Sequence, residues 1–580
     1  MQRTPQIVYT RAVRLFVVLA VFALQTAALA QSDKAAKIND YMTRAASYRQ
    51  FNGTVLVAEN GKVIYKKGLG LANMEWNIPN EVDTKFRLGS ITKQFTSMVI
   101  MQLVEQGKIK LDGKLSEYLP DYRKDTGDKV TIHQLLTHTS GIPSYTGLPN
   151  FFSEVSRDPY TVSDFVKKYA SGDLEFEPGT KFRYNNSGYF LLGAIIEKVT
   201  GKPYEQVLQE NIFDPLGMKN SGYDHYDRLI SKRASGYQKT PTGYINAPYL
   251  DMSLPYAAGS LYSTVEDLYL WDQALYTDKL VSAKSKQLIY TPFLNNYAYG
   301  WGIGKVTLAQ SKETINSISH NGGINGFNTL LVRYPEQKNL IVLLDNTSQG
   351  ENLDRISRDI TNILYNQPFE FPKQSIAEAL MKTITEKDVA AAVKQYRDLK
   401  AAKADYNFEE GELNTLGYQL LAAKKIKEAI EIFKLNAEAY PQAANTYDSL
   451  GEAYMLAGER ELALQSYKKS VELNPQNTNA ATIIKNLEQP AAAVDPVSLD
   501  AFTGQYDIPG LGLIDITKEG DKLLAAPPGK RQVELMPRGT NSFFAAGPNI
   551  TFTFAKDDKG QVTLSLRFPD GHELQAKKVK

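Results

Sequence analysis

The stretch Phe86-Arg-Leu-Gly-Ser-Ile-Thr-Lys93 decides how this sequence is interpreted, because its serine lies three positions before its lysine. A helical pattern follows, with apolar residues on one face from Phe95 until Gly107 interrupts it. Positions i and i+3 of a helix share a face, so we expect Lys93 to lie beside Ser90. A serine hydroxyl becomes a strong nucleophile when a base takes its proton, and burial lowers the pKa of a lysine enough for that task.

A Ser-x-x-Lys pattern is short, and most occurrences are a helix-capping serine followed by a solvated lysine. Two polar groups downstream distinguish this chain, namely Tyr184-Asn-Asn186 and His320-Asn-Gly-Gly323. Each of them alone is compatible with an ordinary loop. The order of the three patterns, and the strand and helix signals around them, together favour a single acyl-transfer site.

Each polar group has an expected role in that site. Tyr184 passes a proton between Ser90 and the leaving group, and Asn186 orients Lys93 and binds a substrate amide. His320 binds a substrate carboxylate or assists proton transfer.

Gly322 and Gly323 leave room for a substrate backbone, and the N–H of Gly323 completes an oxyanion hole with the N–H of Ser90. A competing triad built on Ser140 and His138 is disfavoured, because the chain has no Gly-x-Ser-x-Gly turn to present its serine.

Residues from about 45 to 365 resemble the serine β-lactamase-related group of class C β-lactamases, DD-peptidases, D-aminopeptidases and esterases. The resemblance rests on the stretches above and on Gln134-Leu-Leu-Thr-His-Thr-Ser-Gly141, Pro178-Gly-Thr-Lys-Phe-Arg-Tyr-Asn-Asn186 and Ala258-Gly-Ser-Leu-Tyr-Ser-Thr264. It implies a Ser90 acyl-enzyme, with Lys93 and Tyr184 as proton-transfer partners and Asn186 as a substrate or lysine contact. His320 stands where class C β-lactamases have lysine. The expected substrates are therefore peptides, amides or esters, with D-amino-acid or peptidoglycan-type peptides favoured over β-lactams.

The first 30 residues have the pattern of a signal peptide. Three arginines precede the apolar run 15–24, and Ala28-Leu-Ala30 offers a small-residue cleavage site. An uncleaved N-terminal anchor is the alternative. We expect a periplasmic or secreted protein without stable membrane insertion after cleavage.

Composition excludes several classes of function. Cleavage removes three arginines and no acidic residue, which leaves 63 basic and 64 acidic side chains, so no nucleic-acid partner is expected. The chain has no cysteine, which excludes disulfides and a thiol nucleophile. Its five histidines form no ligand pattern, and we expect neither a metal nor an organic cofactor.

The remaining sequence predicts a multidomain chain. Strand signals at both ends of residues 35–366, with helices between them, predict an α+β domain of the β-lactamase/penicillin-binding type, an antiparallel sheet flanked by helices. Residues 373–488 are helix-rich, and Leu416-Gly417 recurs 34 positions later as Leu450-Gly451. That period is typical of tetratricopeptide units, predicted at 412–445 and 446–479.

After a linker at 489–496, the alternating runs of residues 497–580 predict a small β-barrel or sandwich. The helical repeats are where we expect a protein partner to bind, in addition to the small-molecule or peptide substrate. The alternative function is a non-catalytic ligand-sensing or scaffold protein that binds partners through those repeats.

Overall fold

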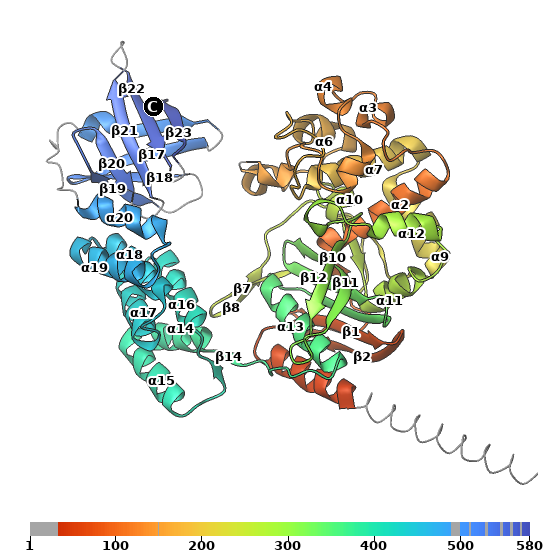
Figure 1. Cartoon of the computed structure of the whole chain (residues 1–580), viewed down its shortest axis with the longest axis horizontal. Helices are drawn as coiled ribbons and strands as arrows, with labels where there is room; N and C mark the ends of the chain where they lie inside the picture. Colours follow the sequence, from red (N-terminus) through yellow and green to blue (C-terminus); the bar gives the residue numbers. More distant parts are fainter. Residues whose placement is uncertain are drawn as a thin grey trace, which may run out of the picture. The chain divides into compact units, whose positions relative to one another are not determined.

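The computed structural model describes residues 33–148, 150–488, 499–509, 512–527, 532–545, 549–556, 561–568 and 571–579. They form two compact units that divide between Pro372 and Lys373 (Figure 1). The predicted signal peptide and linker lie outside the described residues. Within the described ranges, no helix combines the length and the apolar character needed to span a bilayer.

The first unit is built on a six-stranded antiparallel sheet with the order β10-β11-β12-β13-β1-β2. Its strands are β1 (Gly53–Glu59), β2 (Lys62–Leu69), β10 (Gly302–Thr307), β11 (Thr314–Ile324), β12 (Phe327–Tyr334) and β13 (Asn339–Asp345). Because β1 pairs with β13, strands from both ends of the unit meet inside the sheet, as predicted. Asn60 and Gly61 lie at the turn of the hairpin between β1 and β2, and both have the positive φ that such a turn requires.

Alternate residues of the central strands face two separate cores. Val55 and Val57 of β1 pack with the helix at 33–47 and with α13 (Gly350–Leu364). Leu56 and Ala58 face the opposite side, where α2 (Thr92–Glu105) and α7 (Asn186–Thr200) contribute to the core. Figure 1 shows this sheet between its helices, so the predicted α+β arrangement is confirmed.

Shorter elements complete the first unit. The helices are α3 (Leu115–Tyr118), α4 (Lys124–Gly127), α5 (Ile132–Leu136), α6 (Val162–Tyr169), α8 (Tyr204–Leu208), α9 (Asp214–Leu216), α10 (Tyr256–Gly259), α11 (Val265–Ala274) and α12 (Ala283–Tyr290). The strands are β3 (Leu71–Asn73), β4 (Ile78–Pro79), β5 (Phe86–Arg87), β6 (Gly222–Tyr223), β7 (Tyr237–Thr240), β8 (Gly243–Asn246) and β9 (Leu261–Ser263). β5, β9 and β6 form a small sheet in that order, and it leads directly into the turn that carries Ser90.

The second unit begins with a short strand pair, β14 (Gln374–Ser375) with β15 (Tyr406–Asn407), and helices. The helices are α14 (Ile376–Glu386), α15 (Val389–Ala401), α16 (Glu410–Ala422), α17 (Ile426–Ala439), α18 (Ala444–Ala457), α19 (Arg460–Leu473) and α20 (Thr478–Glu488). An added Cβ on Gly417 would collide with the ring of Phe433, and one on Gly451 would meet the ring of Tyr467. The 34-residue repeat therefore marks positions where a ring packs on a glycine. Its tetratricopeptide type stays a prediction.

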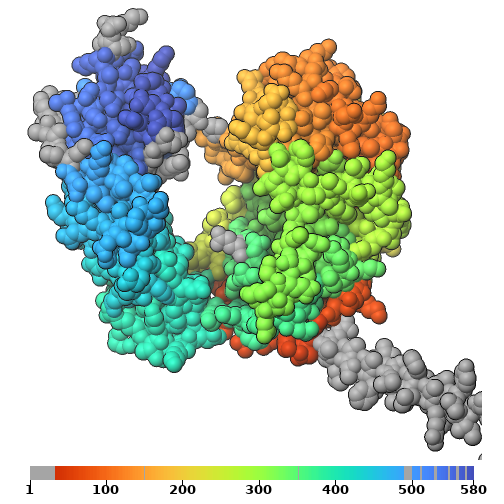
Figure 2. All heavy atoms as spheres, in the orientation of Figure 1, coloured from red at the N-terminus to blue at the C-terminus, as the bar shows by residue number. Residues whose placement is uncertain are grey.

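The second unit ends in an eight-stranded closed barrel, which decides between the two predicted β architectures. Its strands are β16 (Gly504–Ile508), β17 (Gly512–Glu519), β18 (Lys522–Ala526), β19 (Val533–Pro537), β20 (Ser542–Ala545), β21 (Ile550–Lys556), β22 (Val562–Arg567) and β23 (Glu573–Lys578). Pairing of Tyr506 with Lys578 closes it. Phe544 of the barrel packs into the core of the helices, and Figure 2 shows barrel and helices as one continuous body.

Candidate active site

Ser90 lies in η1 (Gly89–Ile91), a turn of 3-10 helix directly before α2. Leu88, just before this turn, is held by two hydrogen bonds. Its N–H donates to the carbonyl oxygen of Leu261 at 2.8 Å, and its own carbonyl accepts from the hydroxyl of Thr329 at 2.7 Å. These bonds fix the turn between strands β9 and β12 and so determine where Ser90 stands.

Glycines allow strand β11 to lie directly against this turn. An added Cβ on Gly322 would collide with the carbonyl oxygen of Leu88, and one on Gly89 would lie 3.0 Å from the nitrogen of Gly323. Gly89 also has a φ of +54°, a conformation that side chains disfavour. The structure therefore brings Gly323 next to the turn that carries Ser90.

Lys93 is fully buried, and its Nζ atom has three polar neighbours. Nζ lies 3.0 Å from Ser90 Oγ, 2.9 Å from Asn186 Oδ1 and 2.8 Å from the carbonyl oxygen of Ala258. Burial lowers the pKa of Lys93 well below its ordinary value. A neutral amine has two N–H groups and one lone pair. Because the two carbonyl oxygens accept the N–H groups, the lone pair faces the hydroxyl of Ser90.

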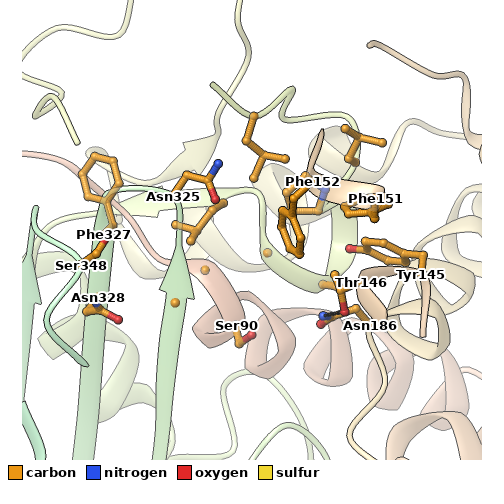
Figure 3. Close-up of a pocket in the computed structure, with 18 of the residues that line it drawn as sticks. Ser90, Tyr145, Thr146, Phe151, Phe152, Asn186, Asn325, Phe327, Asn328 and Ser348 are labelled. Atoms are coloured by element: carbon orange, nitrogen blue, oxygen red, sulfur yellow. Dashed lines mark hydrogen bonds between the residues drawn. The ribbon is translucent and has the colours of Figure 1, made fainter. Parts of the chain in front are cut away.

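Asn186 is the first residue of α7, and neighbouring hydroxyls fix its orientation. Its Nδ2 donates to Thr146 Oγ1 at 3.2 Å, and its backbone N–H donates to Ser144 Oγ at 3.2 Å. With Nδ2 on Thr146, the amide oxygen must face Lys93. Figure 3 shows Asn186 and Thr146 together beside Ser90. Neither Thr146 nor Ser144 belongs to the three sequence patterns, so sequence reasoning missed both.

Tyr184 lies between the pocket and a buried aromatic cluster. Tyr184 is 38% exposed, yet the centroid of its ring lies 4.9 Å from Lys93 Nζ and 4.3 Å from the ring centroid of His138. Desolvation raises the pKa of Tyr184 far above its ordinary value, and a side-chain hydrogen bond with Ser90 opposes part of that rise. Tyr184 is therefore a neutral phenol at physiological pH, in contact with the Ser90 hydroxyl.

His320 lies behind the pocket, inside strand β11. Its Nδ1 is 2.6 Å from the carbonyl oxygen of Asn321, which only accepts, so Nδ1 carries the proton. Nε2 then accepts from the hydroxyl of Tyr297 at 2.9 Å. Burial lowers the pKa of His320 to about 4. The ring is therefore neutral and has both nitrogens hydrogen-bonded. Its centroid lies 5.7 Å from that of Tyr297 and 6.3 Å from that of Tyr184.

Two residues of this cluster were not predicted to belong to the site. His138 is buried with a φ of +57°, and its Nδ1 accepts the backbone N–H of Asn185 at 3.1 Å. Its ring centroid lies 4.6 Å from that of Tyr297. The stretch 134–141, on which the family resemblance partly rests, contains His138 and points to it. None of the sequence patterns includes Tyr297. Ser140 accepts the N–H of Ile142 instead of contacting His138.

Ser90 lies on the floor of a cavity of about 400 Å³ (Figure 3). One side is aromatic and the other mixes aromatic and amide groups. The main lining residues are Tyr145, Phe151, Phe152, Leu250, Leu254, Asn325, Phe327, Asn328 and Ser348, with Asn186 and Gly323 beside Ser90. The arrangement joins a nucleophile, a buried base and an apolar pocket, which suits acyl transfer.

The chain is similar to several known proteins. The Beta-lactamase family model matches residues 35–363. Penicillin-binding protein 4* of Bacillus subtilis (strain 168) is 33% identical over 353 residues, covering 56% of this chain and 75% of that protein. The teichoic acid D-alanine hydrolase of Staphylococcus aureus is 29% identical over 343 residues, covering 57% of this chain and 79% of that protein.

Two solved structures share the fold. The D-amino acid amidase of Ochrobactrum anthropi SV3 has a TM-score of 0.50 and 24% identity, covering 57% of this chain and 99% of its own. The octameric penicillin-binding protein homologue of Pyrococcus abyssi has a TM-score of 0.50 and 21% identity, covering 93% of this chain and 99% of its own.

Proposed function

This chain belongs to the Beta-lactamase family and is a serine hydrolase, and we propose that it acts through an acyl-enzyme on Ser90. The observation that carries the proposal is the contact of Lys93 Nζ with Ser90 Oγ at 3.0 Å. The amine is buried, its pKa is lowered, and two carbonyl oxygens occupy its N–H groups. Such an amine accepts the serine proton as the nucleophile attacks.

In the proposed reaction, Lys93 takes the proton of Ser90 while Oγ bonds to the substrate carbonyl carbon. The backbone N–H groups of Ser90 and Gly323 bind the resulting oxyanion. The leaving oxygen or nitrogen departs with a proton passed through Tyr184. Water then attacks the acyl-enzyme, returns a proton to Ser90 and releases the acid. No metal or organic cofactor takes part.

The proposed substrates are peptides, amides or esters, with D-amino-acid or peptidoglycan-type peptides favoured over β-lactams. The name of one relative, a teichoic acid D-alanine hydrolase, supports substrates that contain a D-amino acid.

Covalent labelling tests the mechanism. We expect a fluorophosphonate probe to label Ser90, with the adduct mapped by mass spectrometry, and Ser90→Ala to abolish it. Ser140→Ala is the matched control, because this buried serine lies outside the pocket lining. An adduct on another residue, or no adduct on a folded protein with several acyl donors, would contradict the proposal.

We also propose export through residues 1–30, for which the predicted signal peptide is the support. The expected result is a mature chain that begins at Gln31 and is recovered from the periplasm or medium. N-terminal sequencing of the protein from its own cells measures this directly.

A partner-binding role of the second unit is the alternative proposal, and its support is the repeated helix packing on Gly417 and Gly451. Ser90→Ala distinguishes the two roles. An enzyme loses activity while still binding its partner, whereas a scaffold protein shows an unchanged cellular phenotype.

A further inference from the structure

The pocket around Ser90 has an uncharged lining. Among its described lining residues there is no lysine, arginine, aspartate or glutamate. Lys93 lies beneath Ser90, but burial favours its neutral amine. The pocket therefore offers a bound substrate no fixed positive charge.

One N–H of each of two side-chain amides in the pocket wall is already hydrogen-bonded within the protein. Asn325 Nδ2 donates to the carbonyl oxygen of Pro248 at 3.0 Å, and Asn328 Nδ2 donates to that of Thr347 at 2.8 Å. Figure 3 shows the side-chain oxygen of Asn328 directed toward the pocket interior. A substrate thus meets the acceptor oxygen of Asn328 on this wall, which suits an N–H donor better than a carboxylate.

The opposite wall is apolar. Tyr145, Phe151 and Phe152 stand there (Figure 3). Leu250 and Leu254 also line the pocket. Phe152 is 57% exposed at the mouth, where an incoming group can cover it. Burial of an apolar substrate group against these side chains is favourable, and burial of an ion is not.

A free carboxylate next to the scissile bond would have to enter this pocket. In a peptide cleaved before its last residue, one carbon separates the carboxylate from the scissile nitrogen, so the ion lies close to Ser90. Moving this carboxylate out of water costs free energy, and the lining has no cation that would compensate for that cost.

We propose that the Ser90 site accepts esters and carboxyl-blocked amides and discriminates against substrates with a free carboxylate beside the scissile bond. This inference rests on the proposed acyl-enzyme function and narrows the substrates proposed there. It disfavours peptides that are cleaved before a free C-terminal residue, and it retains esters and carboxyl-blocked amides and peptides. Acylation forms the Oγ–carbonyl carbon bond, breaks the bond to the leaving oxygen or nitrogen, and releases an uncharged alcohol or a carboxyl-blocked amine with the transferred proton.

A matched substrate pair tests the inference. N-acetyl-D-alanyl-D-lactate and its C-terminal amide contain the same scissile ester and differ in the carboxylate. We expect kcat/KM to be at least about tenfold higher for the amide. Equal values, or a preference for the free acid, would overturn the inference.

A charge-insertion variant provides the second measurement. Ser348 is an exposed lining residue, so Ser348→Arg should fold and place a guanidinium at the pocket. Ser348→Met is the matched uncharged control. We expect Ser348→Arg, relative to Ser348→Met, to shift the acid-to-amide ratio of kcat/KM at least about tenfold toward the acid. An unchanged ratio would mean that the missing cation does not determine specificity.

Labelling separates the two possible failures. Suppose that neither ester is cleaved while the fluorophosphonate labels Ser90. The two compounds are then compared as competitors of that labelling, and the inference requires the compound with the C-terminal amide to compete better than the free acid. If Ser90 resists labelling in the folded protein, the proposed function itself fails.

Discussion

The side-chain oxygen of Asn186 lies 2.9 Å from Nζ of Lys93, and Thr146 holds the amide in that orientation. The lysine is thus paired with a neutral acceptor, which helps to solvate its N–H groups without stabilising a positive charge as a carboxylate would. This neutral pairing and the burial of Lys93 both favour the neutral amine over the ammonium form.

Asn186→Asp should therefore raise the pKa of Lys93. Activity requires the neutral amine, so the rate rises with pH through the pKa of Lys93. A carboxylate at position 186 favours the ammonium form of Lys93. The rising part of the pH–rate profile should therefore shift to higher pH by about one unit or more. The measurement is kcat/KM against pH. Asn325→Asp, in the same pocket but without a contact to Lys93, should move the limb less, and an unshifted Asn186→Asp profile would contradict the expectation.

Thr146→Val should lower kcat by about two- to tenfold, because Asn186 loses the acceptor that orients its amide. Thr146→Ser keeps a hydroxyl and should restore most of the rate. Steady-state kinetics of both variants make the comparison. Equal losses in the two variants would point to packing by the threonine methyl group instead.

His138→Leu should destabilise the first unit by about 1–3 kcal/mol, because the buried N–H of Asn185 loses its acceptor. His138→Asn retains an acceptor and tolerates the positive φ, so it should cost less stability. Both variants lose the ring that packs on Tyr184, and both should lower kcat. Urea unfolding and kinetics separate the two effects. A similar stability for Leu and Asn would exclude the hydrogen bond as the cause.

Asp345 predicts a pH dependence of stability. Burial raises the pKa of this carboxyl to about 7 despite hydrogen bonds from Asn52 and Thr347. Between the ordinary pKa of aspartate, about 4, and pH 7, the folded state binds more protons than the unfolded state. This group alone should therefore make stability fall as pH rises through the window, by on the order of 1 kcal/mol per unit of pKa shift, whereas the lowered pKa of His320 contributes a slope of the opposite sign.

Urea unfolding at several pH values between 4 and 7 measures this slope. Asp345→Asn removes this titrating group, so the slope of stability against pH should be more positive in the variant than in the unaltered protein, whatever the variant does to stability at a single pH. An identical slope in the two proteins would show that Asp345 does not contribute.

Several parts of the fold were predictable because their signals are local. Asn60-Gly61 fits the turn of a hairpin, and β12 and β13 are continuous apolar runs buried in the sheet. Strand β11 was not predicted. Its sequence, Thr-Ile-Asn-Ser-Ile-Ser-His-Asn-Gly-Gly-Ile, has few apolar residues because part of it borders the site, so the His320 pattern lies within a strand and not before one.

The candidate site was predictable as far as its members share short patterns. Ser90 and Lys93 are close in sequence, and Asn186 and Gly323 belong to patterns of their own. Ser90 nevertheless lies in a 3-10 turn before α2, and not in the helix itself. Thr146 and Tyr297 reach the site through tertiary contacts alone, and such contacts leave no spacing signature in the sequence.

The pairing of β1 with β13 has a consequence for the order of folding. Gly53 of β1 faces Asp345 of β13. The first and the last strands of this sheet along the chain are therefore paired with each other inside it. While the chain is synthesised, the β1–β2 hairpin has no partner on its inner edge until nearly all of the first unit has been made. Contacts this distant in sequence form slowly. The first unit should therefore acquire its sheet, and with it the strand beside Ser90, in a late cooperative step, and a chain stopped before residue 339 should not become active.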